Sequence, residues 1–216
     1  MHVLVIGAHP DDEVYGCGGT IARMASEGHE IYVLIVTEGS SAQYKDKKMI
    51  DVKRQEAEKV KELLKIKKYI FGEFADMKLD SVPHLELNKF IEAAIDEIKP
   101  EYIFTHYKHD LNKDHQKIFE STMVAARPGR KFIKRIYSYE VPSTTELGSV
   151  AFQPNKFFNI TSYIDKKKKA VEIYKSELRE YPHARNAEAV EALAKYRGYS
   201  SNLKYAEAFM LIRAIE

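Results

Sequence analysis

The feature that most constrains the fold is a short apolar run at the start of the chain that ends abruptly in a charged loop. Residues 3–6 read Val-Leu-Val-Ile, Gly7 follows, and residues 9–13 hold one imidazole and three carboxylates. An apolar run of this length bounded by glycine is typical of a strand buried inside a parallel sheet. In open α/β sheets, ligands bind in the loops after the carboxyl ends of such strands. The pattern therefore predicts a functional loop directly after the first strand.

The side chains of this first loop admit two interpretations. His9 and Asp12 have the donor types and the close spacing of a metal-ligand pair, and Asp11 lies between them. Pro10 stiffens the turn because its ring fixes its own φ. Alternatively, Asp11 or Asp12 only caps the helix that follows. The loop alone leaves both interpretations open.

The rest of the chain alternates apolar runs with helical stripes. We predict strands at 3–6, 31–36, 69–71, 102–105, 132–141 and 157–160, and helices at 14–27, 52–64, 87–98, 116–126, 163–178, 186–197 and 204–213. This alternation predicts βαβ units in an α/β fold, a Rossmann-like, doubly wound, mostly parallel sheet flanked by helices. Because no linker or internal repeat interrupts the pattern, we expect residues 1–216 to form a single domain with a helical C-terminal part.

A second loop with polar side chains follows the strand at 102–105. Residues 106–115 contain three histidines and two aspartates, and they end in His115. In the commonest doubly wound order the fourth strand lies beside the first, so both loops open into one crevice. His115 then joins His9 and Asp12 as a third ligand, which favours the metal interpretation over capping. Two imidazoles and a carboxylate with an open position are typical of catalytic Zn²⁺, although Fe²⁺ or another divalent ion fits the same donors.

Two aspartates next to these ligands have roles that follow from an open metal site. Such a site polarises a carbonyl and activates a water. Asp11, beside the ligand Asp12, could accept the proton of that water as a general base. Asp114, beside His115, could orient an imidazole through its second nitrogen.

Composition limits the remaining possibilities. The chain has 44% hydrophobic and 31% charged residues and a net charge of +2, which is typical of a soluble globular protein and does not indicate binding to nucleic acid or membranes. A single cysteine excludes an intramolecular disulfide and fits a reducing compartment. The sequence enters a strand directly without a leader, and no apolar stretch approaches membrane-spanning length. We therefore expect a cytoplasmic protein.

Two motifs together resemble a known family. Ala8-His-Pro-Asp-Asp-Glu13 and Asn112-Lys-Asp-His115 resemble the PIG-L/LmbE-type zinc de-N-acetylases, and the resemblance extends to Tyr205-Ala-Glu-Ala-Phe209. That family includes N-acetylglucosaminyl-phosphatidylinositol de-N-acetylases and the deacetylases of mycothiol and bacillithiol synthesis. The resemblance implies a hydrolase that removes the acetyl group from a small N-acetylated sugar, such as an N-acetylglucosamine conjugate. It also implies that His9, Asp12 and His115 bind Zn²⁺, that Asp11 is the base, and that the protein is a homo-oligomer.

The resemblance further implies substrate contacts, with one departure from the family pattern. Arg54 matches a substrate-binding arginine of related members, whereas its own context suggests a charge on a helix surface. Better-known members carry an oxyanion-stabilising histidine three residues before the last ligand, and here that residue is Asn112. An amide donates a hydrogen bond to an oxyanion but cannot act as an acid. We therefore expect another imidazole to serve, and favour His183 over His106 and His109 because its loop, Tyr181-Pro-His-Ala-Arg185, could cover the crevice and bring Arg185 to the substrate.

Three other functions are possible for a chain with these motifs. A different metal-dependent amidase, acting on a sugar or thiol-sugar conjugate, fits the same residues. A dinucleotide-dependent oxidoreductase requires a glycine-rich fingerprint where this chain has Gly7-Ala-His-Pro-Asp-Asp12. A receiver-like metal-binding signalling module requires an aspartate at the end of the third strand and a lysine at the end of the fifth. Here those positions read Phe71-Gly-Glu-Phe74 and Tyr139-Glu-Val141. Tyr15, Tyr44 and Tyr107 could stack on a sugar, but most of the 14 tyrosines should be packing residues.

Overall fold

The computed structural model describes residues 1–42 and 48–216, so that Tyr44, considered above as a sugar-stacking residue, lies outside the described residues. These residues form one seven-stranded sheet in the order β3-β2-β1-β4-β5-β7-β6. Its strands are β1 His2–Gly7, β2 Glu30–Thr37, β3 Lys68–Phe74, β4 Tyr102–His106, β5 Arg135–Tyr139, β6 Lys156–Asn159 and β7 Ala206–Ala214.

The strand pairing confirms the predicted topology. β1 pairs in parallel with both β2 and β4, and β3 and β5 extend the parallel part on either side. β7 is antiparallel to β5 and to β6, so the sheet is mostly parallel. The neighbouring positions of β1 and β4 bring the loops after these strands to the same edge of the sheet, as the predicted order requires.

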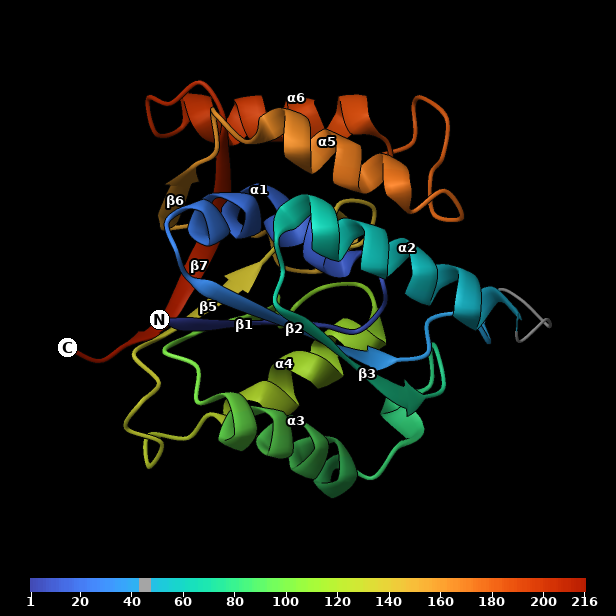
Figure 1. The fold of residues 1–216 in the computed structure, drawn as a ribbon, viewed down its shortest axis with the longest axis vertical. Coiled ribbons are helices and arrows are strands. Elements are labelled where there is room, and N and C mark those ends of the chain that lie inside the picture. Colours follow the sequence, from blue (N-terminus) through green and yellow to red (C-terminus); the bar gives the residue numbers. More distant parts are fainter. Residues whose placement is uncertain (43–47) are drawn as a thin grey trace.

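Helices cover both faces of the sheet. They are α1 Asp12–Ser26, α2 Lys48–Leu64, α3 His84–Ile98, α4 Lys113–Ala125, α5 Ile164–Ile173 and α6 Ala187–Tyr199, with short 3-10 turns η1 Leu79–Ser81 and η2 Thr145–Leu147. Figure 1 shows α1, α2, α5 and α6 on one side of the sheet and α3 and α4 on the other, with α5 and α6 outermost. This arrangement confirms the α/β fold class. None of the helices described has both the length and the apolarity to cross a bilayer.

Two hydrophobic cores lie on opposite faces of the sheet. Along β1, Val3 and Val5 belong to the core beneath α1, α2 and α5, whereas Leu4 and Ile6 belong to the core beneath α3 and α4. Successive side chains of a strand point to opposite faces, so a strand covered on both sides is apolar at every position. The continuous apolar run at the start of the chain is thereby explained, and it fixes the position of the loop that follows.

The predicted helix at 204–213 is wrong, because this segment is strand β7. Its alanine, leucine and methionine residues favour a helix when considered alone. In the fold the segment pairs with β5 on one side and β6 on the other, and these ladders outweigh local propensity. A smaller difference is that α4 begins at Lys113, not near 116, which places Asp114 and His115 in its first turn.

Candidate active site

The candidate site lies where β1 and β4 end. After β1, the backbone turns through His9 and Asp11, and α1 begins at Asp12. Asp11 is the N-terminal cap residue of α1 and has φ 122°, a backbone conformation that residues other than glycine rarely adopt. Such strain costs about 1–3 kcal/mol and persists where the surrounding structure fixes it. After β4, the chain enters the first turn of α4, which carries His115.

The three predicted ligands converge at this point. His9, Asp12 and His115 each offer a ligand atom, and these atoms lie within 4.8 Å of one another. Asp12 Oδ1 is 3.3 Å from His115 Nε2, and Asp12 Oδ2 is 3.3 Å from His9 Nδ1. Among the described residues, the buried polar atoms without a hydrogen-bond partner include Asp12 Oδ1 and both ring nitrogens of His115, although buried polar atoms are normally paired. This donor set fits a divalent cation of the Zn²⁺ type.

Carboxylates lie against the far nitrogens of both histidines. His115 Nδ1 is 3.2 Å from Asp110 Oδ1. His9 Nε2 is 3.1 Å from both Asp76 Oδ1 and Asp114 Oδ2. A carboxylate acceptor at one ring nitrogen keeps the proton there and leaves the other nitrogen free to bind a metal. Asp114 therefore lies against His9 and not against His115, its neighbour in the sequence. The carboxylate that contacts His115 is that of Asp110.

His9, Asp76 and Asp114 form a second group with metal-ligand spacing. This group shares His9 with the first group. Both carboxylate oxygens of Asp114 already accept backbone N–H groups, from Met77 at 2.8 Å and from Leu79 at 3.0 Å. We therefore interpret Asp76 and Asp114 as acceptors that orient His9.

Burial and charge set the protonation of these groups. Burial opposes charge on His9, but hydrogen bonds to Asp114, Asp12 and Asp76 raise its pKa well above the ordinary value. Burial likewise opposes charge on His115, and the charge of Asp12 raises its pKa. A cation that binds here must displace protons from these imidazoles, so binding weakens as pH falls.

His106 is neutral and serves to pack the site. Its ring stacks on His115 with the centroids 3.8 Å apart, and its Nε2 accepts the backbone N–H of Ala8 at 2.9 Å. Burial and the charge of His115 lower the pKa of His106 to about 4. This imidazole therefore does not supply the acid that Asn112 lacks.

Asp11 lines the site and forms an ion pair with Arg185. Its Oδ2 lies 2.7 Å from Nη1 of Arg185, which also contacts Glu177 Oε2 at 3.3 Å. The Arg185 Nε donates to Ser143 Oγ at 3.0 Å, so the guanidinium is held from three sides. Burial raises the pKa of Asp11 to about 7, although Arg185 acts in the opposite direction. A carboxyl group that titrates near neutrality is suited to accept and return a proton.

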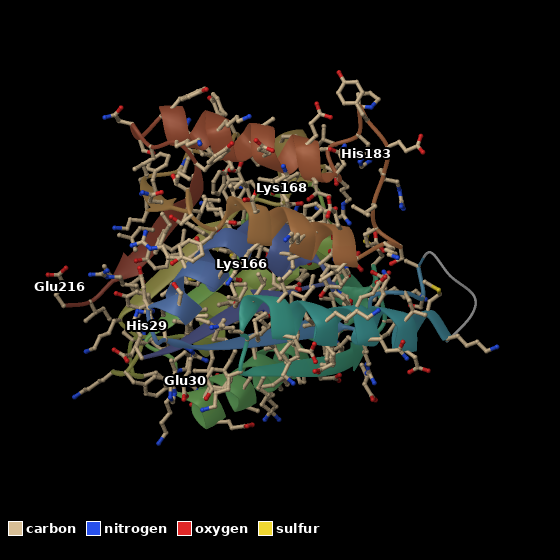
Figure 2. The ribbon with its side chains drawn as sticks, turned by 45° about the horizontal axis from the view of Figure 1, so that its top comes forward. His29, Glu30, Lys166, Lys168, His183 and Glu216 are labelled. Atoms are coloured by element: carbon tan, nitrogen blue, oxygen red, sulfur yellow. The ribbon has the colours of Figure 1, made fainter. Side chains whose placement is uncertain are left out.

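These groups open into a cavity of about 270 Å³. Of the predicted residues, His9, Asp11, Asn112, His183 and Arg185 line it, while Asp12, Asp114 and His115 lie buried nearby. Figure 2 shows His183 on the loop between α5 and α6, at the margin of the molecule.

The two candidate oxyanion donors differ in how they are held. The Nδ1 of His183 accepts the backbone N–H of Arg185 at 3.0 Å. Asn112 caps α4, since its Oδ1 accepts the Asp114 N–H at 2.8 Å, and its Nδ2 donates to Met77 Sδ at 3.5 Å. The amide nitrogen of Asn112 is therefore the part of this side chain that can donate to a substrate.

The structure does not bring Arg54 to this cavity. Its guanidinium lies over the Phe71 ring, 5.5 Å from the centroid, and it borders a separate shallow surface pocket. Its neighbour Lys53 lines the cavity instead, with Nζ 2.6 Å from Glu177 Oε1 and a hydrogen bond to the Gly39 carbonyl. One step along a helix turns the side chain by roughly 100°, so adjacent residues face different sides.

Four residues of the site were not singled out from the sequence: Lys53, Asp76, Asp110 and Glu177. Asp76 and Asp110 follow the carboxyl ends of β3 and β4, so the rule that located His9 would also have indicated them. Lys53 and Glu177 form a buried ion pair between α2 and the segment after α5, which no local pattern reveals.

Comparison with known proteins agrees with the motifs. The family model PIG-L, described as GlcNAc-PI de-N-acetylase, matches residues 4–126. The chain is 32% identical over 183 residues to the uncharacterized deacetylase YaiS of Escherichia coli K12, covering 81% of this chain and 90% of that protein. It is 28% identical over 184 residues to the probable N-acetyl-alpha-D-glucosaminyl L-malate deacetylase 2 of Bacillus cereus, covering 82% and 83%.

A solved structure with the same fold is GalB, the 4-carboxy-2-hydroxymuconate hydratase of Pseudomonas putida KT2440. Its TM-score is 0.80 at 24% identity, covering 100% of this chain and 98% of GalB. This likeness concerns the fold alone. The family match, which spans both ligand-bearing loops, and the identity with YaiS confirm the resemblance drawn from the two motifs: the chain belongs to the PIG-L family.

Proposed function

We propose that this protein is a metal-dependent hydrolase that removes the acetyl group from an N-acetylated sugar of the N-acetylglucosamine type. The observation that carries the proposal is the convergence of His9, Asp12 and His115 beside a cavity lined by Asp11. The names of the Escherichia coli and Bacillus cereus relatives, both deacetylases, support the reaction class.

His9, Asp12 and His115 would hold one divalent cation, Zn²⁺ or a metal with similar preferences. The unpartnered Asp12 Oδ1 and His115 Nε2 support this assignment. The second group with metal-ligand spacing, His9, Asp76 and Asp114, shares His9 with the first. We therefore infer a single ion per chain. When bound, the ion supplies a Lewis acid that polarises the acetyl carbonyl and makes a water more acidic.

Asp11 would move the proton in both halves of the reaction. Its carboxylate takes a proton from the water as the water oxygen bonds to the carbonyl carbon and the carbonyl oxygen becomes an oxyanion. Asp11 then returns this proton to the sugar nitrogen as the C–N bond breaks, which gives acetate and a free amine. Arg185, 2.7 Å away, keeps the Asp11 carboxylate oriented.

The oxyanion needs a hydrogen-bond donor from the cavity wall. We propose His183, because its Nδ1 accepts the Arg185 N–H and the proton of a neutral ring is then on Nε2, available to a substrate. The Nδ2 of Asn112 is the alternative donor in the same cavity. Because they line the cavity, Arg185 and Asn112 would contact the substrate, and no such contact is proposed for Arg54.

A substrate panel tests this proposal. Protein stripped of metal and reloaded with Zn²⁺ is incubated with free N-acetylglucosamine, an N-acetylated disaccharide, simple and thiol-bearing N-acetylglucosaminyl conjugates, and a nucleotide sugar. We expect equal amounts of primary amine and acetate from at least one compound. Release of neither product from any of them would contradict the proposal, and turnover of 4-carboxy-2-hydroxymuconate, the substrate in the name of GalB, would then indicate a hydratase.

Two further expectations stay predictions. A homo-oligomer is tested by light scattering on the purified protein across a tenfold range of concentration, where a monomer mass throughout would contradict it. The cytoplasmic location is tested by fractionating cells that express the full-length protein at its natural level.

A further inference from the structure

A buried carboxylate connects the catalytic loop to two distant parts of the chain. Glu13, in the first turn of α1, is fully buried. Its Oε2 accepts the backbone N–H of Asp11 at 3.0 Å. Its Oε1 accepts the hydroxyls of Tyr69, in β3, at 2.9 Å and of Tyr174, directly after α5, at 2.6 Å. Both carboxylate oxygens are thus used, one toward Asp11 and one toward the tyrosine pair.

The Asp11 backbone needs such a support. At φ 122° it is in a conformation that is strained for any residue with a side chain. The N–H of this residue is buried at the start of α1, where a helix has no internal acceptor for it. The carboxylate of Glu13 satisfies this N–H and so stabilises the strained conformation. That conformation determines where the Asp11 carboxylate points.

Burying a carboxylate is costly unless its hydrogen bonds are made. An acidic residue can favour a helix N-terminus through the helix dipole alone, without burial or specific partners. Glu13 instead lies in the core between α1, α2 and α5, and two buried tyrosines hold it. The arrangement therefore fits a specific task for this side chain.

We propose that Glu13, held by Tyr69 and Tyr174, is a positioning residue for Asp11. It fixes the strained backbone of Asp11 so that the carboxylate faces the substrate. This rests on the proposed function, in which Asp11 is the general base. Glu13 itself makes no contact with the substrate.

Two substitutions of Glu13 distinguish the effect of its hydrogen bonds on kcat from the effect of its side-chain volume. Glu13→Met keeps a similar size and removes both acceptors. Glu13→Gln keeps an amide oxygen for the Asp11 N–H, and its NH₂ can donate to the hydroxyl oxygens of the tyrosines. We expect Glu13→Met to lower kcat about 10- to 100-fold, because a misplaced group loses rate steeply. KM and bound metal should change less than about twofold, and Glu13→Gln should restore kcat to within about threefold of the wild type.

A matched control comes from β7, where Glu207 contacts the same helix α1. Glu207 is also buried, accepts the backbone N–H groups of Gly19 and Thr20 of α1, and pairs with Lys167 at 2.5 Å. Glu207→Met therefore removes a buried carboxylate that contacts the backbone of α1, without touching Asp11. It should destabilise the protein and keep kcat.

A double-mutant cycle with Asp11→Asn decides the matter. A positioning residue has no effect once the group that it positions is gone, so Glu13→Met should not lower the residual kcat of Asp11→Asn further. If Glu13→Met does not fold, Tyr69→Phe combined with Tyr174→Phe goes through the same cycle with the same expectation.

The outcomes distinguish this proposal from the one on which it rests. Near-normal turnover of Asp11→Asn would overturn the base role and the positioning role together. An impaired Asp11→Asn beside an active Glu13→Met would overturn the positioning role alone. Loss of bound metal in Glu13→Met would also overturn the positioning role. The same holds if Glu13→Met lowers kcat by an equal factor in the wild type and in Asp11→Asn.

Discussion

Replacing Glu13 by glutamine should stabilise the metal-free protein at high pH. Burial raises the pKa of Glu13 from 4.5 to about 7, although hydrogen bonds from Tyr174 and the Asp11 N–H act to lower it. Because the pKa is higher in the folded state, that state holds the proton more tightly. The stability that this carboxyl contributes at low pH is therefore lost as the pH rises from 4.5 through 7. Because glutamine cannot ionise, the free energy of unfolding of the variant does not fall with pH in this way.

The size of the effect follows from the two pKa values. Linkage gives a loss of ~0.8 kcal/mol at pH 5 and ~3.3 kcal/mol at pH 8 for the wild type. The advantage of Glu13→Gln should therefore grow by ~2.5 kcal/mol between these pH values. The measurement is urea unfolding of both proteins at 25 °C, with a chelator present so that metal binding does not contribute. The difference between the two free energies of unfolding is followed in steps from pH 5 to pH 8.

A difference that stays flat across this range would refute the reasoning. It would mean that Glu13 titrates in its ordinary range in the folded protein, and that the hydrogen bonds from the two tyrosine hydroxyls and the Asp11 N–H fully offset the effect of burial. A difference that shrinks with pH would reverse the sign and imply that the folded state favours the ionised carboxylate.

Three other predictions follow from the geometry. Asp11→Asn should keep its metal and lose about 10²- to 10⁴-fold in kcat, and near-normal turnover would show that Asp11 is not the base. His183→Ala should lower kcat about 10²- to 10³-fold, while Asn112→Ala does little; the reverse ranking would assign the oxyanion to the amide. Gly16→Ala would place a Cβ 2.3 Å from Cδ2 of Tyr139, so thermal unfolding should show a loss of about 1–3 kcal/mol, and an unchanged Tm would contradict this packing.

The convergence of His9, Asp12 and His115 could be predicted because it depends on two simple rules. Apolar runs mark the parallel strands, and neighbouring parallel strands end at the same edge. Once β1 and β4 are adjacent, their loops must meet. The strand order is the common one, so local pattern and general topology were sufficient.

Other parts of the structure depend on contacts that no local pattern carries. β7 consists of residues that also favour a helix, and its pairing partners decide its conformation. Lys53 and not Arg54 reaches the cavity because burial of α2 sets its rotation, and the stripe of apolar residues fixes that rotation only approximately. The link from Glu13 to Tyr69 and Tyr174 spans 161 residues and requires the folded chain.

Metal-dependent deacetylation at this site is tested most directly by titrating metal-stripped protein with Zn²⁺ and following acetate release from the best substrate of the panel. The account predicts a rate that rises linearly and saturates at one equivalent of metal per chain, and a His115→Ala variant that shows no such rise. A rate that is independent of added metal, or that is the same in His115→Ala as in the wild type, would contradict it.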